Sequence, residues 1–138
     1  MKKSVFVVLF MLLFAGCAGS PYQLAQMDSG QLSLVSDYDL LGALSNTAYR
    51  NEMMFAEAKS RGLLNDNDIR LVKKGKLVRG MSENALIATK GQPLMIKRET
   101  YKSAIIKQYI YGFDTKYTSQ TYVIVNGGTV RSWFIKKK

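Results

Sequence analysis

The most reactive type of side chain in this sequence is the thiol of Cys17, the single cysteine among 138 residues. A thiol can act as a nucleophile, bind a metal ion or carry a covalent modification. The sequence contains no histidine, the usual base of a cysteine nucleophile and the commonest metal ligand. With one cysteine, the chain also offers no partner for an internal disulfide. The residue types alone therefore assign no role to this thiol.

The segment before Cys17 has the composition of a secretory signal. Lys2 and Lys3 precede an apolar run over residues 5–15, and small residues follow from Gly16 to Ser20. The run has about 11 residues, whereas a helix needs roughly 20 to cross the hydrocarbon core of a bilayer. The pattern predicts that residues 1–16 form a cleaved signal peptide and not a membrane span.

Residues 14–17, Phe-Ala-Gly-Cys, resemble the lipobox of bacterial lipoproteins, with Phe14 where leucine is usual. The resemblance implies that Cys17 carries a diacylglycerol and that the new amino terminus receives a further acyl chain such as palmitate. Two or more chains attach a protein stably to a membrane. Ala18 is not the aspartate that retains lipoproteins of this class at the inner membrane, which implies the periplasmic face of the outer membrane. The alternative, a buried free cysteine, is disfavoured by the preceding signal.

Among the acidic residues, Asp66 and Asp68 in the segment NDNDI are the closest to a metal-binding pattern. The segment lacks the glycine and the twelfth-position glutamate of a calcium loop, so both aspartates are predicted to lie at a helix start. No Gly-rich phosphate loop is present. A Ser/Lys catalytic pair stays open, although no pair is singled out. The sequence predicts no metal, no cofactor and no enzymatic activity.

Charge is distributed unevenly along a chain with a formal net charge of +10. Most lysines and arginines lie in residues 70–138, whereas residues 20–69 carry an excess of acidic side chains. A basic surface attracts anionic lipid headgroups, acidic envelope polymers or an acidic patch on a protein. Nucleic acid is excluded as a partner if the protein faces the periplasm. The alternative is that the lysines are simply solvated.

The patterns along the chain predict a tether followed by one α+β domain. Residues 17–35 are polar and lack a clear period, which favours a lipid-anchored tether. The domain over 36–138 has a helical part over 36–75 and a helix plus sheet over 76–138. Helices are predicted over 37–49, 52–60, a short turn near 66, and 83–90 with Ser82 as N-cap, and strands over 94–101, 105–113 and 120–135 with a hairpin at 126–128. The expected fold is two to three short helices on one face of a three- to four-stranded antiparallel meander.

The last strand pair alternates between two faces. One face carries Val123, Val125, Val130 and Phe134, and the other carries Tyr122, Ile124, Arg131 and Trp133. The valine face is predicted to pack against the helices, which leaves the other face exposed. The opposite assignment, with Trp133 beneath the helices, stays open. The predicted partner contacts are the strand aromatics and one neighbouring cation: Tyr109, Tyr111, Tyr122, Trp133 and Arg131.

Several short motifs in residues 76–135 resemble the SmpA/OmlA (BamE-like) family of outer-membrane lipoproteins. The motifs are RGMS at 79–82, GQP at 91–93, YIYG at 109–112 and VIVNGGTV at 123–130 before Trp133. The resemblance implies a helix-plus-sheet fold. The family includes a small accessory subunit of the β-barrel assembly machinery, and another lipoprotein of this type with an added helical pair and a different role stays open. Residues 36–75 lie outside the resemblance.

The leading functional hypothesis is a non-catalytic, lipid-anchored module that binds an envelope protein complex. Such a module would support outer-membrane protein assembly or envelope integrity. The first alternative is a binder of anionic phospholipid headgroups or peptidoglycan. The second is a structural subunit of a secretion or conjugation apparatus, or a phage-encoded exclusion lipoprotein.

Overall fold

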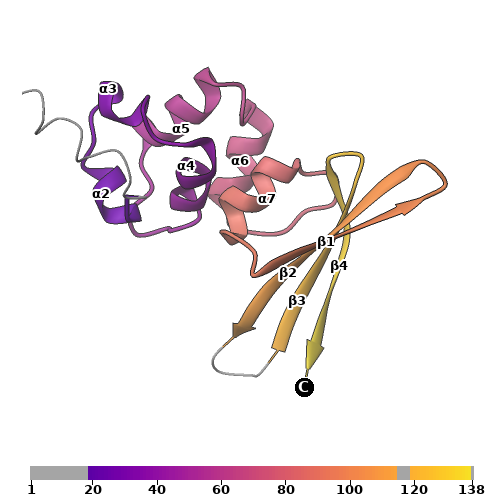
Figure 1. The fold of residues 1–138 in the computed structure, drawn as a ribbon. Helices are drawn as coiled ribbons and strands as arrows, with labels where there is room; N and C mark the ends of the chain where they lie inside the picture. The colour runs from indigo at the N-terminus through magenta and orange to yellow at the C-terminus, as the bar shows by residue number, and fades with distance from the viewer. Residues whose placement is uncertain (1–18, 115–118, 138) are drawn as a thin grey trace, which may run out of the picture.

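The computed structural model describes residues 19–114 and 119–137, which form an α+β fold (Figure 1). The helices are α2 (Pro21–Ala25), α3 (Ser29–Leu32), α4 (Asp37–Leu44), α5 (Glu52–Ser60), α6 (Asp66–Lys74) and α7 (Glu83–Lys90). The strands are β1 (Met95–Tyr101), β2 (Ala104–Asp114), β3 (Ser119–Asn126) and β4 (Thr129–Lys137). The predicted α+β class and antiparallel meander are confirmed, and the helical layer is larger than expected. The predicted signal peptide over 1–16 and Cys17 lie outside the described residues.

Each helix begins at a side chain that accepts a hydrogen bond from a backbone N–H in the first turn. The predicted cap at Ser82 is confirmed, and Ser36 caps α4 in the same way. The predicted turn near residue 66 is a nine-residue helix, α6, capped by Asn65. It ends at Gly75, whose φ of 66° lies in the left-handed region that glycine enters without strain. Local sequence chemistry therefore sets the helix starts.

The prediction of a tether over residues 17–35 is wrong for the part that the structure describes. Residues 21–25 and 29–32 are helical, and Leu24 and Leu32 are fully buried in the core. The capping boxes at Ser20/Gln23 and Asp28/Gln31 start these helices. Each helix is too short to show an apolar period, so the burial of its leucine determines that the segment belongs to the domain.

The sheet has the order β1-β2-β3-β4, and all neighbours are antiparallel. The predicted hairpin between β3 and β4 is confirmed, with Gly127 and Gly128 both at positive φ. The helices lie on one side of the strands, against their upper ends in Figure 1. The segment before α7 joins the sheet directly, because Gly80 N donates to Val130 O and Val130 N donates to Met81 O.

A β-bulge in β4 reverses two predicted positions. Val125 pairs with Val130, but Ile124 pairs with Ser132, so Arg131 is an extra residue in the strand. Trp133 consequently lies opposite Val123, on the helix-facing side, and Phe134 lies on the other side. The predicted faces of Trp133 and Phe134 are therefore wrong, because one inserted residue shifts the alternation. The burial of all three valines (Val123, Val125 and Val130) is confirmed.

Arg61, at the end of α5, connects three segments of the helical layer. Its two terminal nitrogens donate to the carbonyl oxygens of Leu32 (2.6 Å) and Val35 (2.7 Å). It also forms ion pairs with Asp37 (2.9 Å) and Glu57 (2.7 Å). The hydrogen bonds to Asp37 and Glu57 raise the pKa of Arg61 further above its ordinary value. The guanidinium group thus donates hydrogen bonds to the end of α3 and to the turn that leads into α4.

Candidate partner-binding surface

The face of the sheet opposite the helices, which we call the open face, carries one apolar side chain from each strand in a continuous row. Met95 pairs with Ile110, Ile110 with Tyr122, and Tyr122 with Phe134. Directly opposed residues in an antiparallel sheet share a face, so the row crosses all four strands. The rings of Tyr122 and Phe134 stack with their centroids 4.9 Å apart and an interplanar angle of 1°.

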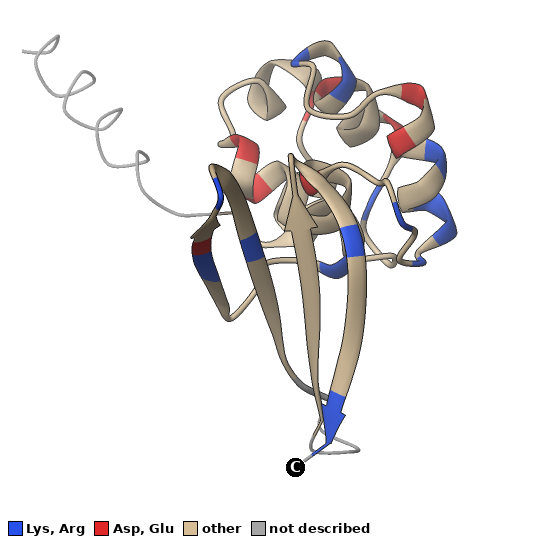
Figure 2. Cartoon of the chain, turned by 90° about the vertical axis from the view of Figure 1, so that its right-hand side faces the viewer, with Lys and Arg blue, Asp and Glu red and all other residues tan. Residues whose placement is uncertain are grey.

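The open face forms an apolar cluster separate from the core. Ile110 is only 7% exposed but does not belong to the buried core cluster, which contains its neighbours Tyr109 and Tyr111. Phe134, at the end of the row, is 48% exposed. None of the described helices covers this side, and Figure 2 shows few charged residues along the strands. The exposed ends of the row, Met95 and Phe134, thus present apolar and aromatic side chains to solvent.

The structure does not bring the predicted contact residues together. Tyr122 lies on the open face, half-buried beside Phe134. The predicted exposure of Tyr109 and Tyr111 is wrong, because β2 turns both side chains toward the helices and buries them. Trp133 is 39% exposed but faces the helix side of β4, while Arg131 is exposed within the bulge.

Sequence reasoning missed Met95, Ile110 and Phe134 as members of the surface. Alternation along the strand places Ile110 on the face opposite Tyr109 and Tyr111, but only the burial of these two tyrosines shows that Ile110 lies on the open face. Met95 required the register of β1 with β2, and Phe134 required the register of β3 with β4, which the bulge at Arg131 shifts. The row is therefore formed by the pairing of the four strands and cannot be recognised from a local sequence motif.

A partly buried polar network joins α7 to the sheet. The Glu83 carboxylate accepts hydrogen bonds from Lys107 Nζ (2.7 and 3.0 Å) and from the Tyr109 hydroxyl. Burial disfavours the charged carboxylate, but the hydrogen bonds from Lys107 and Tyr109 lower the pKa of Glu83 below 4.5. Burial, together with the Glu83 carboxylate, raises the pKa of Tyr109 above 10. The network fixes the helix start relative to β2.

Replacing Glu83 by glutamine is expected to reduce the loss of unfolding free energy that occurs as the pH falls below 4.5. A carboxylate with a lowered folded-state pKa contributes its full stability above pH 4.5 and loses it as the pH falls through the folded-state value. Glu83→Gln should therefore cost about 1 kcal/mol of unfolding free energy at neutral pH and less near about pH 3. Urea unfolding at both pH values measures the difference. The exposed Glu52, paired with Lys73, supplies the control Glu52→Gln, which should change little.

A result in which Glu83→Gln lowers the unfolding free energy equally at both pH values would contradict the assigned titration. It would show that the substitution acts through packing.

The Tyr111 hydroxyl is buried and has no hydrogen-bond partner among the residues that the structure describes. Burial raises its pKa above 10, and the nearby Tyr38 adds to this effect. Tyr111 lines a groove together with Lys90, Gln92, Thr121 and Ile135. Because its hydroxyl gains no hydrogen bond from residues 19–114 and 119–137 in exchange for lost water, Tyr111 contributes to this part of the structure through the apolar packing of its ring.

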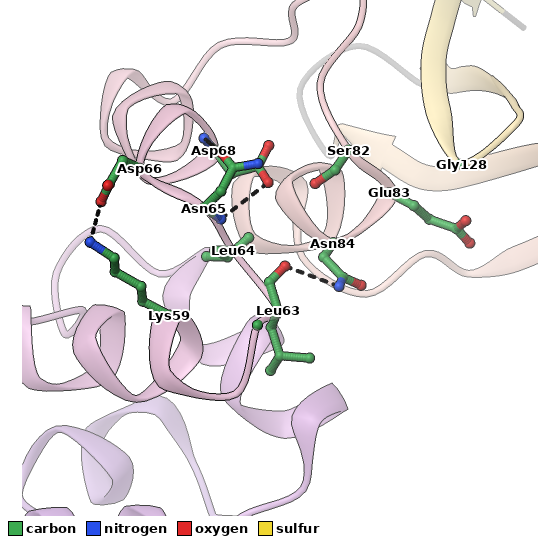
Figure 3. A pocket seen from close by; sticks show the side chains of 11 residues that line it. Lys59, Leu63, Leu64, Asn65, Asp66, Asp68, Ser82, Glu83, Asn84 and Gly128 are labelled. Atoms are coloured by element: carbon green, nitrogen blue, oxygen red, sulfur yellow. Dashed lines mark hydrogen bonds and ion pairs between the residues drawn. The ribbon is translucent and has the colours of Figure 1, made fainter.

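A second candidate site is an open cleft of about 610 Å³ between the α5–α6 turn and the start of α7 (Figure 3). Its acidic side chains are engaged within the fold. Asp68 accepts from the Asn65 backbone N–H, Asp66 pairs with Lys59 at 2.6 Å, and Glu83 points away from both aspartates. The predicted helix-start role of Asp66 and Asp68 is confirmed. The cleft is thus a structural junction.

The basic residues are distributed over several elements. Unevenly spaced cations lie at the end of α6, in the segment that follows it, on β1 and at the end of β4: Lys73, Lys74, Lys76, Arg79, Lys97, Arg98, Lys136 and Lys137. Figure 2 shows part of this set along the helical layer. Lys97 and Lys136 share the open face, because they pair with Gln108 and Gln120. They place positive charge beside the apolar row.

Over residues 19–114 and 119–137, no group of three or more acidic, cysteine or histidine side chains is arranged to hold a metal ion. Within the same ranges, none of the helices has both the length and the apolar character needed to cross a bilayer. No protein-family model, curated protein or solved structure matches the chain.

Proposed function

We propose that this protein is a lipid-anchored, non-catalytic lipoprotein of the outer membrane, facing the periplasm, whose open face binds an envelope protein complex. The row formed by Met95, Ile110, Tyr122 and Phe134 carries the proposal. Aromatic and methionine side chains are enriched at the centres of protein interfaces, where charged residues are depleted. Lys97 and Lys136 at the margin would favour a partner with acidic residues around an apolar centre.

The proposed anchor is supported by the signal-like segment and the lipobox resemblance ending at Cys17. An acylated protein is confined to a thin layer beside the membrane, which raises its effective concentration near membrane partners. A modest interface can then suffice. The SmpA/OmlA resemblance over residues 76–135 nominates the β-barrel assembly machinery as the first complex to test.

The proposal is tested by affinity purification from detergent-solubilised envelopes with the full chain. The Phe134→Ser variant should remain acylated and membrane-bound but lose about tenfold or more of the captured partner, as expected for a central interface residue. Ile105→Ser is the matched control, since Ile105 is similarly exposed but lies on the helix-facing side of β2. Cys17→Ala should move the protein out of the membrane fraction.

Unchanged protein capture by Phe134→Ser would exclude the open face as the binding surface. Recovery of phospholipid or peptidoglycan without protein would instead favour the alternative of an anionic ligand. The exposed cations Lys97 and Lys136 motivate this alternative. Binding dominated by such charges should weaken steeply as salt is added, whereas an apolar interface should weaken less.

A further inference from the structure

The fold begins almost immediately after the proposed lipid anchor. Gly19 already packs tightly, because a Cβ atom there would lie 2.5 Å from Cδ1 of the fully buried Leu24. Ser20 N donates to Gln23 Oε1 (2.9 Å), and Gln23 N donates to Ser20 Oγ (3.3 Å). These contacts hold the backbone in one conformation from Gly19 onward.

Helix α2 is itself attached to the rest of the helical layer. Asn51 Nδ2 donates to the carbonyl oxygen of Ala25 at 3.2 Å. The rings of Tyr22 and Tyr49 meet edge to face, with centroids 5.6 Å apart. Leu24 belongs to the buried core cluster. The helix would have to lose these contacts to act as a flexible linker.

The connection between lipid and fold is therefore one residue long. Only Ala18 separates Cys17 from Gly19 in the sequence. Two consecutive Cα spacings span at most about 7.6 Å. The two headgroup layers of a bilayer together account for roughly 10–15 Å of its thickness. Each layer is therefore about as thick as the distance that these two spacings can span. A domain attached at Cys17 must consequently touch the membrane surface.

The surface next to this attachment point is suited to contact with lipid headgroups. Residues 18–27 carry no charged side chain. Tyr22 is 58% exposed, and Tyr49 beside it is also exposed. Tyrosine is enriched at membrane interfaces, because its ring is apolar and its hydroxyl stays hydrated. In Figure 1, α2 and β4 lie on opposite sides of the molecule.

We propose that α2 lies directly on the bilayer, with Tyr22 and Tyr49 in the headgroup layer and β4 held away from the membrane. This inference rests on the proposed acylation of Cys17. It gives the lipoprotein a defined orientation, in which the connection to the lipid is too short for the domain to explore the periplasm. A protein partner would then meet the sheet at a restricted distance from the membrane.

Fluorescence quenching by brominated lipid tests the orientation, because bromine quenches only tryptophans at membrane depth. The acylated full chain is placed in phosphatidylcholine vesicles whose acyl chains carry bromine near the headgroup. Trp133 is the only tryptophan of the chain and reports on β4. We expect no quenching of Trp133, but about twofold or greater quenching of the tryptophan in a Tyr22→Trp/Trp133→Phe variant.

A matched variant lengthens the connection with about 20 Gly/Ser residues between Ala18 and Gly19, which gives an average span of roughly 25 Å. In the Tyr22→Trp/Trp133→Phe background, this insertion should abolish most of the quenching. Circular dichroism verifies that both variants are folded. Mass spectrometry of the same samples verifies acylation of Cys17.

The outcomes separate this inference from the proposed function. Absence of the acyl mass would refute the lipoprotein proposal itself. Acylated protein without quenching at position 22, or with quenching of Trp133, would refute the orientation alone. Equal quenching with and without the inserted residues would show that the short connection does not place α2 on the membrane.

Discussion

Replacing Arg61 by alanine is expected to lower the free energy of unfolding by about 2–4 kcal/mol. The guanidinium group donates to the carbonyls of Leu32 and Val35 and is largely shielded from solvent. Its removal takes the guanidinium donor from both carbonyls and leaves the Leu32 carbonyl with the Val35 N–H at 3.0 Å, and a buried acceptor that loses a partner costs more than an exposed one. Urea unfolding monitored by circular dichroism measures the change.

Two variants identify the origin of this loss. Arg61→Lys keeps the charge but not the forked geometry that reaches two carbonyls at once, so it should retain less than half of the lost stability. Lys59→Ala removes an exposed ion pair with Asp66 and should cost less than about 1 kcal/mol. Equal losses for Arg61→Ala and Lys59→Ala would show that Arg61 acts as an ordinary surface charge.

Raising the pH above 10 is expected to destabilise the protein steeply through Tyr109 and Tyr111. Burial raises the folded-state pKa of each hydroxyl above the ordinary value of 10, with Glu83 adding to the effect at Tyr109. A raised folded-state pKa contributes stability that is complete below pH 10 and is lost as the pH rises toward the folded-state value. Each tyrosine should remove about 1.4 kcal/mol per pH unit over this range.

Phenylalanine substitutions separate this effect from the titration of lysines. Tyr111→Phe should remove the contribution of one tyrosine to the alkaline loss of stability. It should leave the free energy of unfolding at neutral pH unchanged or higher by up to about 1 kcal/mol, because the hydroxyl has no hydrogen-bond partner in the described part of the chain. Tyr109→Phe should remove a similar share but cost about 1–2 kcal/mol at neutral pH through the lost hydrogen bond to Glu83. Tyr101→Phe, at an exposed site, is the control.

Unfolding free energies measured from about pH 9 to about pH 11 show whether the two buried tyrosines cause the alkaline loss of stability. An alkaline slope that is the same in Tyr101→Phe and in the double variant of Tyr109 and Tyr111 would contradict the assignment to the two buried tyrosines.

The proposed binding surface could be predicted only in part. The sequence indicated an exposed aromatic sheet face, and Tyr122 lies on the open face. Tyr109 and Tyr111 were placed on the wrong face because aromatic composition does not reveal which side of a strand the helices cover. Phe134 and Trp133 exchanged faces because the bulge at Arg131 leaves no signature in the alternating pattern.

Local chemistry in the sequence by itself determined where most elements begin and end. The capping side chains at Ser36, Ser82 and Asn65 and the glycines after Asn126 act on neighbouring backbone groups, so their effects can be predicted without knowledge of the fold. The α+β class followed from helical patterns preceding extended ones.

Only the tertiary structure determined which side chains are buried and which are exposed. Residues 20–35 joined the domain because Leu24 and Leu32 are buried by helices distant in sequence. Arg61 reaches back to the α3–α4 turn, and Glu83 reaches forward to β2, across separations that no local pattern encodes. Burial and strand register depend on contacts between remote segments, and these contacts determine both the open face and the short connection to the proposed anchor.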